Sequence, residues 1–281
     1  MLNIKEREGI DVKLSETPDI HIKNVSFAYP GTENNAINDV SFIIKNGETI
    51  AIIGENGSGK STLIRLITGL YLPNSGDVLY DDINTKEVSM KSLFEKMSAV
   101  FQKYQRYQLT LRDNITISQT DNPVTSKGAH ITDLDVENSE LDAITKMSGF
   151  SKDDPSFTDG YDTMLSREFD GVDLSGGQWQ RVSIARGFFR THNMIVLDEP
   201  TAAIDPFEET QIYNRFANIS KDKTAIIVTH RLGSVKLANR ILVMDKGNLV
   251  KIGTHNELIK KNGEYARLYA AQEQWLYEGL Y

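Results

Sequence analysis

The chain has 281 residues, of which 40% are hydrophobic and 25% charged, with a formal net charge of −8 and no cysteine. This composition is typical of a soluble globular protein with one large or two small domains, and it excludes disulfides and cysteine chemistry. The acidic balance argues against a general nucleic-acid-binding face, so no nucleic acid partner is expected. No apolar run approaches the ~18 residues that would span a bilayer.

The N-terminal part begins with a polar stretch, residues 1–19, which we interpret as a linker or tail. Residues 20–29 and 36–45 alternate between apolar and polar side chains and predict two antiparallel strands. The first stops at Pro30-Gly31, and the second leads to Asn46-Gly47, a pair typical of hairpin turns.

The next stretch is a full match to the phosphate-binding pattern of Gly, four residues, Gly-Lys-Ser/Thr. Its residues, with one following, are Gly54, Glu55, Asn56, Gly57, Ser58, Gly59, Lys60, Ser61 and Thr62. The apolar run at 48–53 predicts a buried strand before this loop, and residues 62–69 have helical spacing after it. Strand, loop and helix N-terminus gather backbone N–H groups around one point, which predicts a polyphosphate site. Lys60 should reach the β- and γ-phosphates, and the Ser61 hydroxyl should hold Mg²⁺.

The middle of the chain changes character. Residues 76–82 and 98–101 predict two more short strands. Residues 103–173 are polar and lack long apolar runs, with helical spacing around 140–147. We interpret this span as a helical insertion on the α/β core, with a loose segment near residues 120–135.

A second glycine-rich helix start follows the insertion. It consists of Leu174, Ser175, Gly176, Gly177 and Gln178. Backbone N–H groups at such a start form another nest for phosphate. A single ATP cannot easily occupy two nests that lie on different lobes. The pattern therefore suggests a dimer in which each ATP is held between the loop of one subunit and the nest of the other.

Two acids come after the buried strand at 194–197, namely Asp198 and Glu199. Ligands of open α/β sheets bind at this edge of the sheet. Asp198 can hold Mg²⁺, and Glu199, on the other face of the pleat, suits a base for attacking water. A solvated acidic turn is the alternative, but the accompanying phosphate loop favours the site.

The C-terminal part returns to short buried strands. Residues 224–229 predict one that ends at His230. Residues 240–244 and 248–252 predict a final hairpin, and residues 255–278 predict amphipathic helices.

Three single residues could join the site, although each also has an ordinary structural explanation. Gln102 ends a strand beside the insertion and could touch Mg²⁺ or water. His230 could sense the γ-phosphate, and Tyr29, beside a turn, could stack on adenine.

Together, these motifs resemble the nucleotide-binding domain of an ABC transporter over about residues 20–275. Residues 54–61 match the Walker A loop and residues 194–199 the Walker B strand. Residues 174–178 match the signature motif without a substitution, and this is the most specific element.

The resemblance implies ATP and Mg²⁺ as cofactors and ATP hydrolysis as the activity. It places Tyr29 in the adenine-stacking position, Gln102 in the Q-loop and His230 in the switch position. Ala203, Ile204 and Asp205 take the loop that crosses the dimer. Catalytic roles would fall to Glu199, His230 and Gln102, and Mg²⁺ would be bound by Ser61, Gln102 and Asp198.

The fold implied is α/β, a P-loop, RecA-like and mainly parallel sheet core with an antiparallel β subdomain and an inserted α-helical subdomain. After the tail, residues 20–102 would form the antiparallel strands and the first part of the core. Residues 103–190 would form the helical subdomain, and residues 191–281 the second part of the core and the C-terminal helices.

Finer features resemble the exporter branch of the family. Residues 229–232 resemble the exporter switch loop, and residues 253–258 and 263–266 an exporter C-terminus. Residues 1–19 resemble the linker that follows the membrane helices of many exporters, whereas residues 167–171 depart from the usual exporter sequence. The resemblance implies a half-transporter domain, similar to those of bacterial peptide or lantibiotic exporters, at the cytoplasmic face of the membrane. Its partners would be a transmembrane domain and a second nucleotide-binding domain in an ATP-dependent head-to-tail dimer.

Three alternatives stay open at this point. The chain could be a soluble ABC ATPase without a membrane partner, but it has neither a paired ATPase unit nor a long coiled-coil insertion. It could be a regulatory module that binds ATP without hydrolysing it, against which Glu199 and His230 argue. A P-loop kinase or GTPase would leave the signature motif unexplained.

Overall fold

A computed structural model of the chain describes residues 9–119, 131–200, 204, 206–229, 235–261 and 263–278. The described chain divides into two compact units. The first holds the residues up to Met97, Asn193–Glu199 and those from Ser220 onward, and the second holds Ser98–His192 and Pro200–Ile219. No described helix combines the length and the apolar character needed to cross a membrane.

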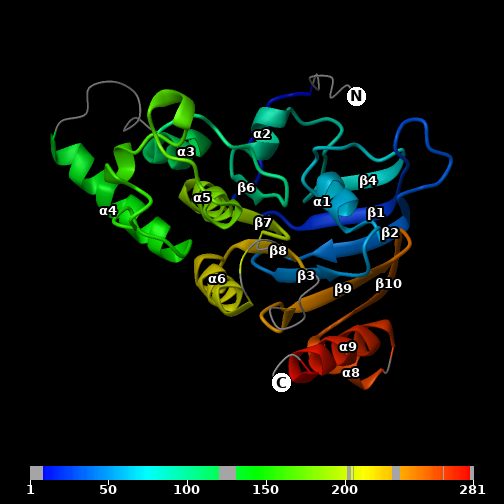
Figure 1. The fold of residues 1–281 in the computed structure, drawn as a ribbon. Coiled ribbons are helices and arrows are strands. Elements are labelled where there is room, and N and C mark those ends of the chain that lie inside the picture. The colour runs from blue at the N-terminus through cyan, green and yellow to red at the C-terminus, as the bar shows by residue number, and fades with distance from the viewer. Residues whose placement is uncertain are drawn as a thin grey trace. The chain divides into compact units, whose positions relative to one another are not determined.

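A four-stranded antiparallel sheet in the order β2-β1-β4-β5 forms one part of the first unit (Figure 1). Its strands are β1 (Ile20–Phe27), β2 (Ile37–Ile44), β4 (Ser75–Tyr80) and β5 (Ile83–Asn84). The buried residues of β1 and β2 are apolar and mostly alternate, because successive side chains of a strand point to opposite faces, and the alternation breaks where the register of the two strands shifts.

The first-unit strands of the larger, mainly parallel sheet are β10, β9, β3, β8 and β7 in that order, and β10 runs antiparallel to β9. Their bounds are β3 (Thr49–Ile53), β7 (Met194–Asp198), β8 (Thr224–Val228), β9 (Arg240–Asp245) and β10 (Asn248–Gly253). β3 runs parallel to β8 and β9, and β7 parallel to β8. All residues of β7 and β8 are buried, as expected for parallel strands covered on both faces.

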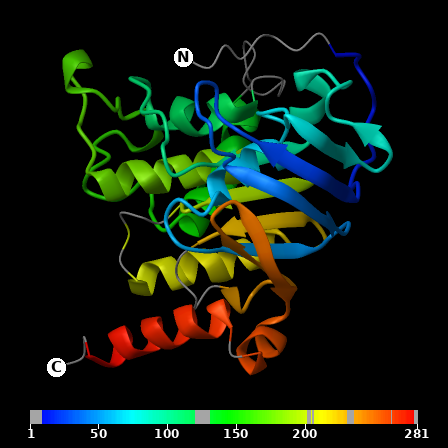
Figure 2. The ribbon, with the colours of Figure 1, turned by 90° about the vertical axis from the view of Figure 1, so that its right-hand side faces the viewer.

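Within the described residues, helices with defined bounds complete the first unit. They are α1 (Lys60–Ile67), α2 (Met90–Phe94), α8 (His255–Lys260) and α9 (Glu264–Glu278). In Figure 2 the β9–β10 hairpin leads directly into α8 and α9. Leu258 of α8 and Tyr265 of α9 belong to one buried cluster with Ala51 and Ile53 of β3. The two C-terminal helices therefore share a core with the sheet that ends at the phosphate loop.

These sheets confirm the expected fold class, and they correct one turn. Asn46-Gly47 does not close a hairpin, because β2 pairs with β1 whereas β3 pairs with β8 and β9 in the other sheet. The turn instead passes the chain from one sheet to the other.

The second unit is mainly helical, and β6 (Met97–Val100) leads into it. Its helices are α3 (Leu111–Thr116), η1 (Ile117–Gln119), α4 (Ile131–Met147), η2 (Gly160–Asp162), η3 (Arg167–Phe169), α5 (Gly176–Phe189) and α6 (Pro206–Ile219). Phe188 of α5 stacks on Phe216 of α6, with ring centroids 6.4 Å apart. Arg215 of α6 donates to the backbone oxygen of Lys146 at the end of α4.

The second unit also corrects the extent of the loose segment expected at 120–135. α4 begins at Ile131, so the last residues of that segment are helical. Ile131 and Leu134 have the i, i+3 spacing of a helix, but most of the surrounding residues are polar and the prediction placed them in the loose segment. Residues 120–130 of the expected segment lie outside the described residues.

Candidate functional site

The phosphate loop connects β3 to α1 in the first unit and wraps around the side chain of Lys60. Lys60 is only 6% exposed, and its Nζ donates to the backbone oxygens of Gly54 at 2.9 Å and Glu55 at 3.0 Å. Burial lowers the pKa of the Lys60 ammonium, and the carboxylates of Glu199 and Asp198 oppose this shift. The loop thus surrounds the Lys60 ammonium. Charged phosphate oxygens would bind this cation more strongly than the two neutral carbonyl oxygens do.

The tightest backbone position of the loop is Gly54. Its φ is +152°, and an added Cβ would lie 2.2 Å from the backbone oxygen of Met244. Ser58 joins the loop to the β9–β10 turn, since its backbone oxygen accepts from the Gly247 N–H at 3.0 Å. The exposed tip includes Glu55, whose carboxylate accepts from Arg267 of α9 at 2.8 Å. The sequence pattern included Glu55, but the structure turns its side chain toward α9.

Ser61 and Asp198 meet at the N-terminus of α1. The Ser61 Oγ donates to the Asp198 Oδ1 at 3.2 Å, across 137 residues of sequence. Asp198 is 3% exposed, and burial raises the pKa of its carboxyl, while the Ser61 hydroxyl opposes the rise and Glu199 adds to it. Among the described residues, no group of three or more His, Cys, Asp or Glu side chains could hold a metal ion.

Glu199 lies one residue beyond β7 in an unusual backbone conformation. Its φ is +48°, which is uncommon for a residue other than glycine, and its N–H donates to the Val228 oxygen at 3.0 Å. This left-handed backbone, rather than the alternation of the strand, sets the direction of the half-buried side chain. Strained conformations of this kind cluster at functional sites.

Tyr29 follows β1 and reaches α1 with its hydroxyl. The Tyr29 Oη lies 2.9 Å from the Thr62 Oγ1 and accepts from the Arg65 Nη1 at 3.2 Å. Its ring stands edge-on to Phe27 and Tyr71, with centroids 5.2 and 6.0 Å away. The sequence analysis missed Arg65 and Tyr71 as neighbours of Tyr29. The spacing of Arg65 three residues after Thr62, on one face of a helix, was the available signal.

The signature stretch begins α5 in the second unit and is capped by its own side chains. The Ser175 Oγ accepts from the Gln178 N–H at 3.3 Å, and the Gln178 Oε1 accepts from the Ser175 N–H at 2.9 Å, which is a capping box. Leu174 and Trp179 are buried on either side, whereas Ser175 and Gly176 are exposed. The box uses the N–H groups of Ser175 and Gln178 and does not involve those of Gly176 and Gly177.

The segment after β6 is also in the second unit. Gln102 and Arg106 are exposed there, and Tyr107 is half-buried beneath the Arg186 guanidinium, 4.7 Å from its ring centroid. Tyr104 donates to the Gly176 oxygen at 2.9 Å, which links this segment to the start of α5. His230, Ala203 and Asp205 lie outside the described residues.

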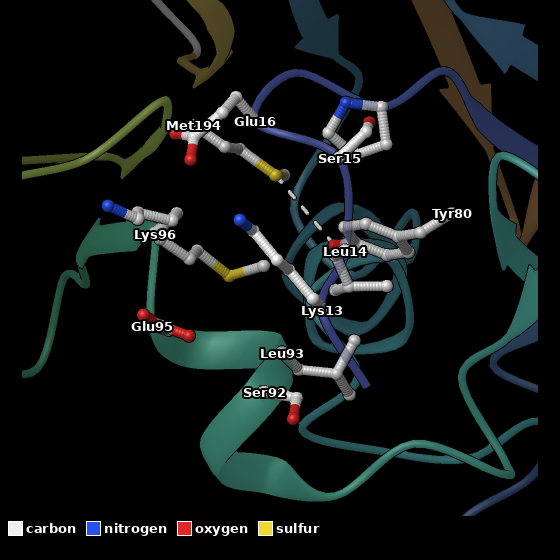
Figure 3. Close-up of a pocket in the computed structure, with 12 residues that line it drawn as sticks. Lys13, Leu14, Ser15, Glu16, Tyr80, Ser92, Leu93, Glu95, Lys96 and Met194 are labelled. Carbon is white, nitrogen blue, oxygen red and sulfur yellow. Dashed lines mark hydrogen bonds between the residues drawn. The ribbon is translucent and has the colours of Figure 1, made fainter. Parts of the chain in front are cut away.

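A cavity of about 220 Å³ lies elsewhere in the first unit (Figure 3). It is enclosed by the segment at 13–18, by Tyr80, by residues at and after the end of α2, and by Met194. The Tyr80 hydroxyl donates to the Ile67 oxygen at 2.9 Å and lies 3.7 Å from the Met194 sulfur. None of the residues expected at the nucleotide site lines it, so this cavity is separate from that site.

The loop, its buried lysine and the parallel strands around them define a P-loop nucleotide-binding protein. Comparison with known families identifies the family within this class. The sequence profile of the ABC transporter family matches residues 37–202. The chain belongs to the ABC transporter family and contains its nucleotide-binding ATPase domain.

Known proteins of similar sequence and structure are transporters. The chain is 40% identical over 271 residues to the subtilin transport ATP-binding protein SpaT of Bacillus subtilis, covering 95% of this chain and 42% of SpaT. It is 35% identical over 253 residues to an ATP-dependent lipid A-core flippase of Haemophilus ducreyi, covering 90% of this chain and 41% of the flippase. A bacterial Atm1-family ABC exporter solved with ATP bound has a TM-score of 0.81 and 29% identity, over 95% of this chain and 44% of the exporter. The chain thus spans less than half the length of these relatives.

Proposed function

We propose that this chain is the ATP-hydrolysing domain of an exporter and works in a head-to-tail pair at the cytoplasmic face of a membrane. The observation that carries the proposal is the cluster at the N-terminus of α1, where Lys60 is buried in the loop and Ser61 binds Asp198. The export relatives support the coupling to a transmembrane domain. Their names give different cargoes, so we assign none to this chain.

In hydrolysis a water oxygen bonds to the γ-phosphorus, the bond from that phosphorus to the β–γ bridging oxygen breaks, and ADP and phosphate leave. Lys60 and the N–H groups at the start of α1 bind the phosphates. Glu199 accepts the proton of the attacking water. Gln102 and His230 would orient that water and the γ-phosphate, as the family resemblance implies.

The donor set fits Mg²⁺. The Ser61 hydroxyl and the Asp198 carboxylate, 3.2 Å apart, are oxygen ligands, and Mg²⁺ typically combines one or two of these with phosphate oxygens and water. The family resemblance implies Gln102 as a further ligand. When bound, Mg²⁺ neutralises charge that develops on the phosphates.

The partner subunit would complete each site. The donors of Ser175, Gly176 and Gly177, held in place by Gln178, would bind the γ-phosphate of the nucleotide on the other chain. Hydrolysis would then separate the pair.

The test is a phosphate-release assay with Glu199→Gln. Removal of a general base should slow turnover by about 10²–10⁴-fold while MgATP still binds. Glu87→Gln, an exposed acid of the same unit, is the matched control and should turn over like the wild type. Wild-type protein that binds MgATP but releases no phosphate would instead favour the non-hydrolysing regulatory module.

A further inference from the structure

The hydroxyl of Tyr29 is fixed to the helix that carries the phosphate loop. Arg65 is always charged and only donates, so the Tyr29 oxygen accepts from it at 3.2 Å. The phenol proton is then available to the Thr62 Oγ1 at 2.9 Å. Thr62 is 7% exposed, so this contact lies at the buried end of the tyrosine.

The ring of Tyr29 contacts two other aromatic rings. It lies at 82° to the Phe27 ring and at 89° to the Tyr71 ring. Those two rings stack on each other at 5.4 Å, and the Arg65 guanidinium lies 5.6 Å from the Tyr71 centroid. Arg65 therefore contacts both the phenol of Tyr29 and the ring beside it.

Thr62 belongs to the anion-binding end of α1. The helix begins at Lys60, and Leu63 is the first of its residues whose N–H bonds back, to the Gly59 oxygen at 2.8 Å. The N–H groups of Lys60, Ser61 and Thr62 precede that bond and are the donors a phosphate would use. A phosphate at this helix end would compete with Tyr29 for the Thr62 hydroxyl.

We propose that the Tyr29 hydroxyl, tethered to Thr62 and positioned by Arg65, occupies part of the nucleotide site in the free protein and is displaced by the phosphates of the nucleotide. This inference rests on the proposed function. The hydroxyl and the ring of Tyr29 then have opposite effects on nucleotide affinity. The hydroxyl lowers the affinity for polyphosphate, and the ring raises the affinity for the base.

Two ligands distinguish these effects, namely ATP and tripolyphosphate, which has no base. Calorimetric titration of Tyr29→Phe should show both ligands binding about 2- to 10-fold more tightly, because one tethering hydrogen bond is lost from the free state. Tyr29→Ala should also bind tripolyphosphate more tightly than the wild type, but it should bind ATP about 5- to 100-fold more weakly than Tyr29→Phe does, since base stacking is lost. A residue that only supports the fold would weaken both ligands in both variants.

Tyr269→Phe on α9 is the matched control for loss of a phenol from the same unit, and it should leave both affinities unchanged. Tyr29→Phe protein with unchanged or weaker tripolyphosphate affinity overturns the tether, provided that the wild type binds ATP. Wild-type protein that binds neither ligand overturns the proposed function as well. Thermal melts of each variant show whether the comparison is made between folded proteins.

Discussion

The two glycine-rich helix starts, one in each unit, differ in what surrounds their N–H groups. At the start of α1, Lys60 is 6% exposed and bonded to its own loop, and the Ser61 hydroxyl binds Asp198. At the start of α5, Ser175 and Gly176 are exposed, and the helix end is closed by the capping box that the side chains of Ser175 and Gln178 form. The start of α1 therefore has a cation, Lys60, and an acid, Asp198, beside its N–H groups. The start of α5 offers backbone N–H groups without a charged side chain of this kind.

The same local pattern can therefore serve two roles in phosphate binding. A helix N-terminus with a buried lysine can bind a phosphate within one chain. In the proposed pair, a capped and exposed start would offer its donors to the nucleotide of the partner chain. The proposed head-to-tail pair follows from this asymmetry, and each variant below tests one side of it.

Lys60→Ala should have the largest effect on binding. The lysine makes charge-assisted contacts to phosphate, each worth about 1.5–3 kcal/mol, so MgATP affinity of the monomer should fall by roughly 10- to 150-fold and most hydrolysis should be lost. Equilibrium titration with a fluorescent ATP analogue measures this. Near-normal turnover would remove the loop from the mechanism.

Ser175→Arg should leave the MgATP affinity of the monomer within about 2-fold, because in the proposed pair the start of α5 holds the nucleotide of the partner chain and not that of its own. It should block pairing by adding bulk and charge at an exposed position. In Glu199→Gln protein, where ATP persists, size-exclusion chromatography should show an ATP-driven dimer. Adding Ser175→Arg should abolish it. A dimer that ignores ATP, or one that survives Ser175→Arg, contradicts the asymmetry.

Gly54→Ala and Gly176→Ala compare the two starts as backbone. At Gly54 the added methyl group meets the Met244 backbone oxygen at a φ of +152°, which should cost about 1–3 kcal/mol of stability. At Gly176 the added Cβ meets no heavy atom within 4 Å apart from its chain neighbours and the backbone of its own helix, so the melting temperature should not fall. Equal losses in thermal melts would show that the second start is packed as tightly as the first.

Much of this site could be predicted from sequence, because its motifs are local. The spacing of residues 54–61 and of residues 174–178 contains the helix starts themselves. The Asn46-Gly47 hairpin failed because a dipeptide specifies a turn but not the sheet that its next strand joins. The Tyr29–Thr62 contact could not be predicted either, since it joins residues 33 apart through side-chain packing.

Asp198→Asn should give the smallest change in folding stability. The sign of this change tests whether the Asp198 carboxylate destabilises the ligand-free protein. Because burial raises the pKa of Asp198 in the folded chain, the folded chain binds more protons than the unfolded chain as pH rises above the unfolded value of 3.8. Stability therefore falls across that window, and the cost of the ionised carboxylate is fully present at neutral pH. An asparagine still accepts from Ser61 without that charge, so the ligand-free variant should gain about 0.5–2 kcal/mol at pH 7 and lose this advantage near pH 4. Asp173→Asn, an exposed acid just before the second start, is the matched control and should shift stability by less than about 0.5 kcal/mol. Thermal melts at both pH values that showed the two variants to be alike would contradict this prediction. The ionised Asp198 carboxylate would then not destabilise the start of α1 in the ligand-free protein.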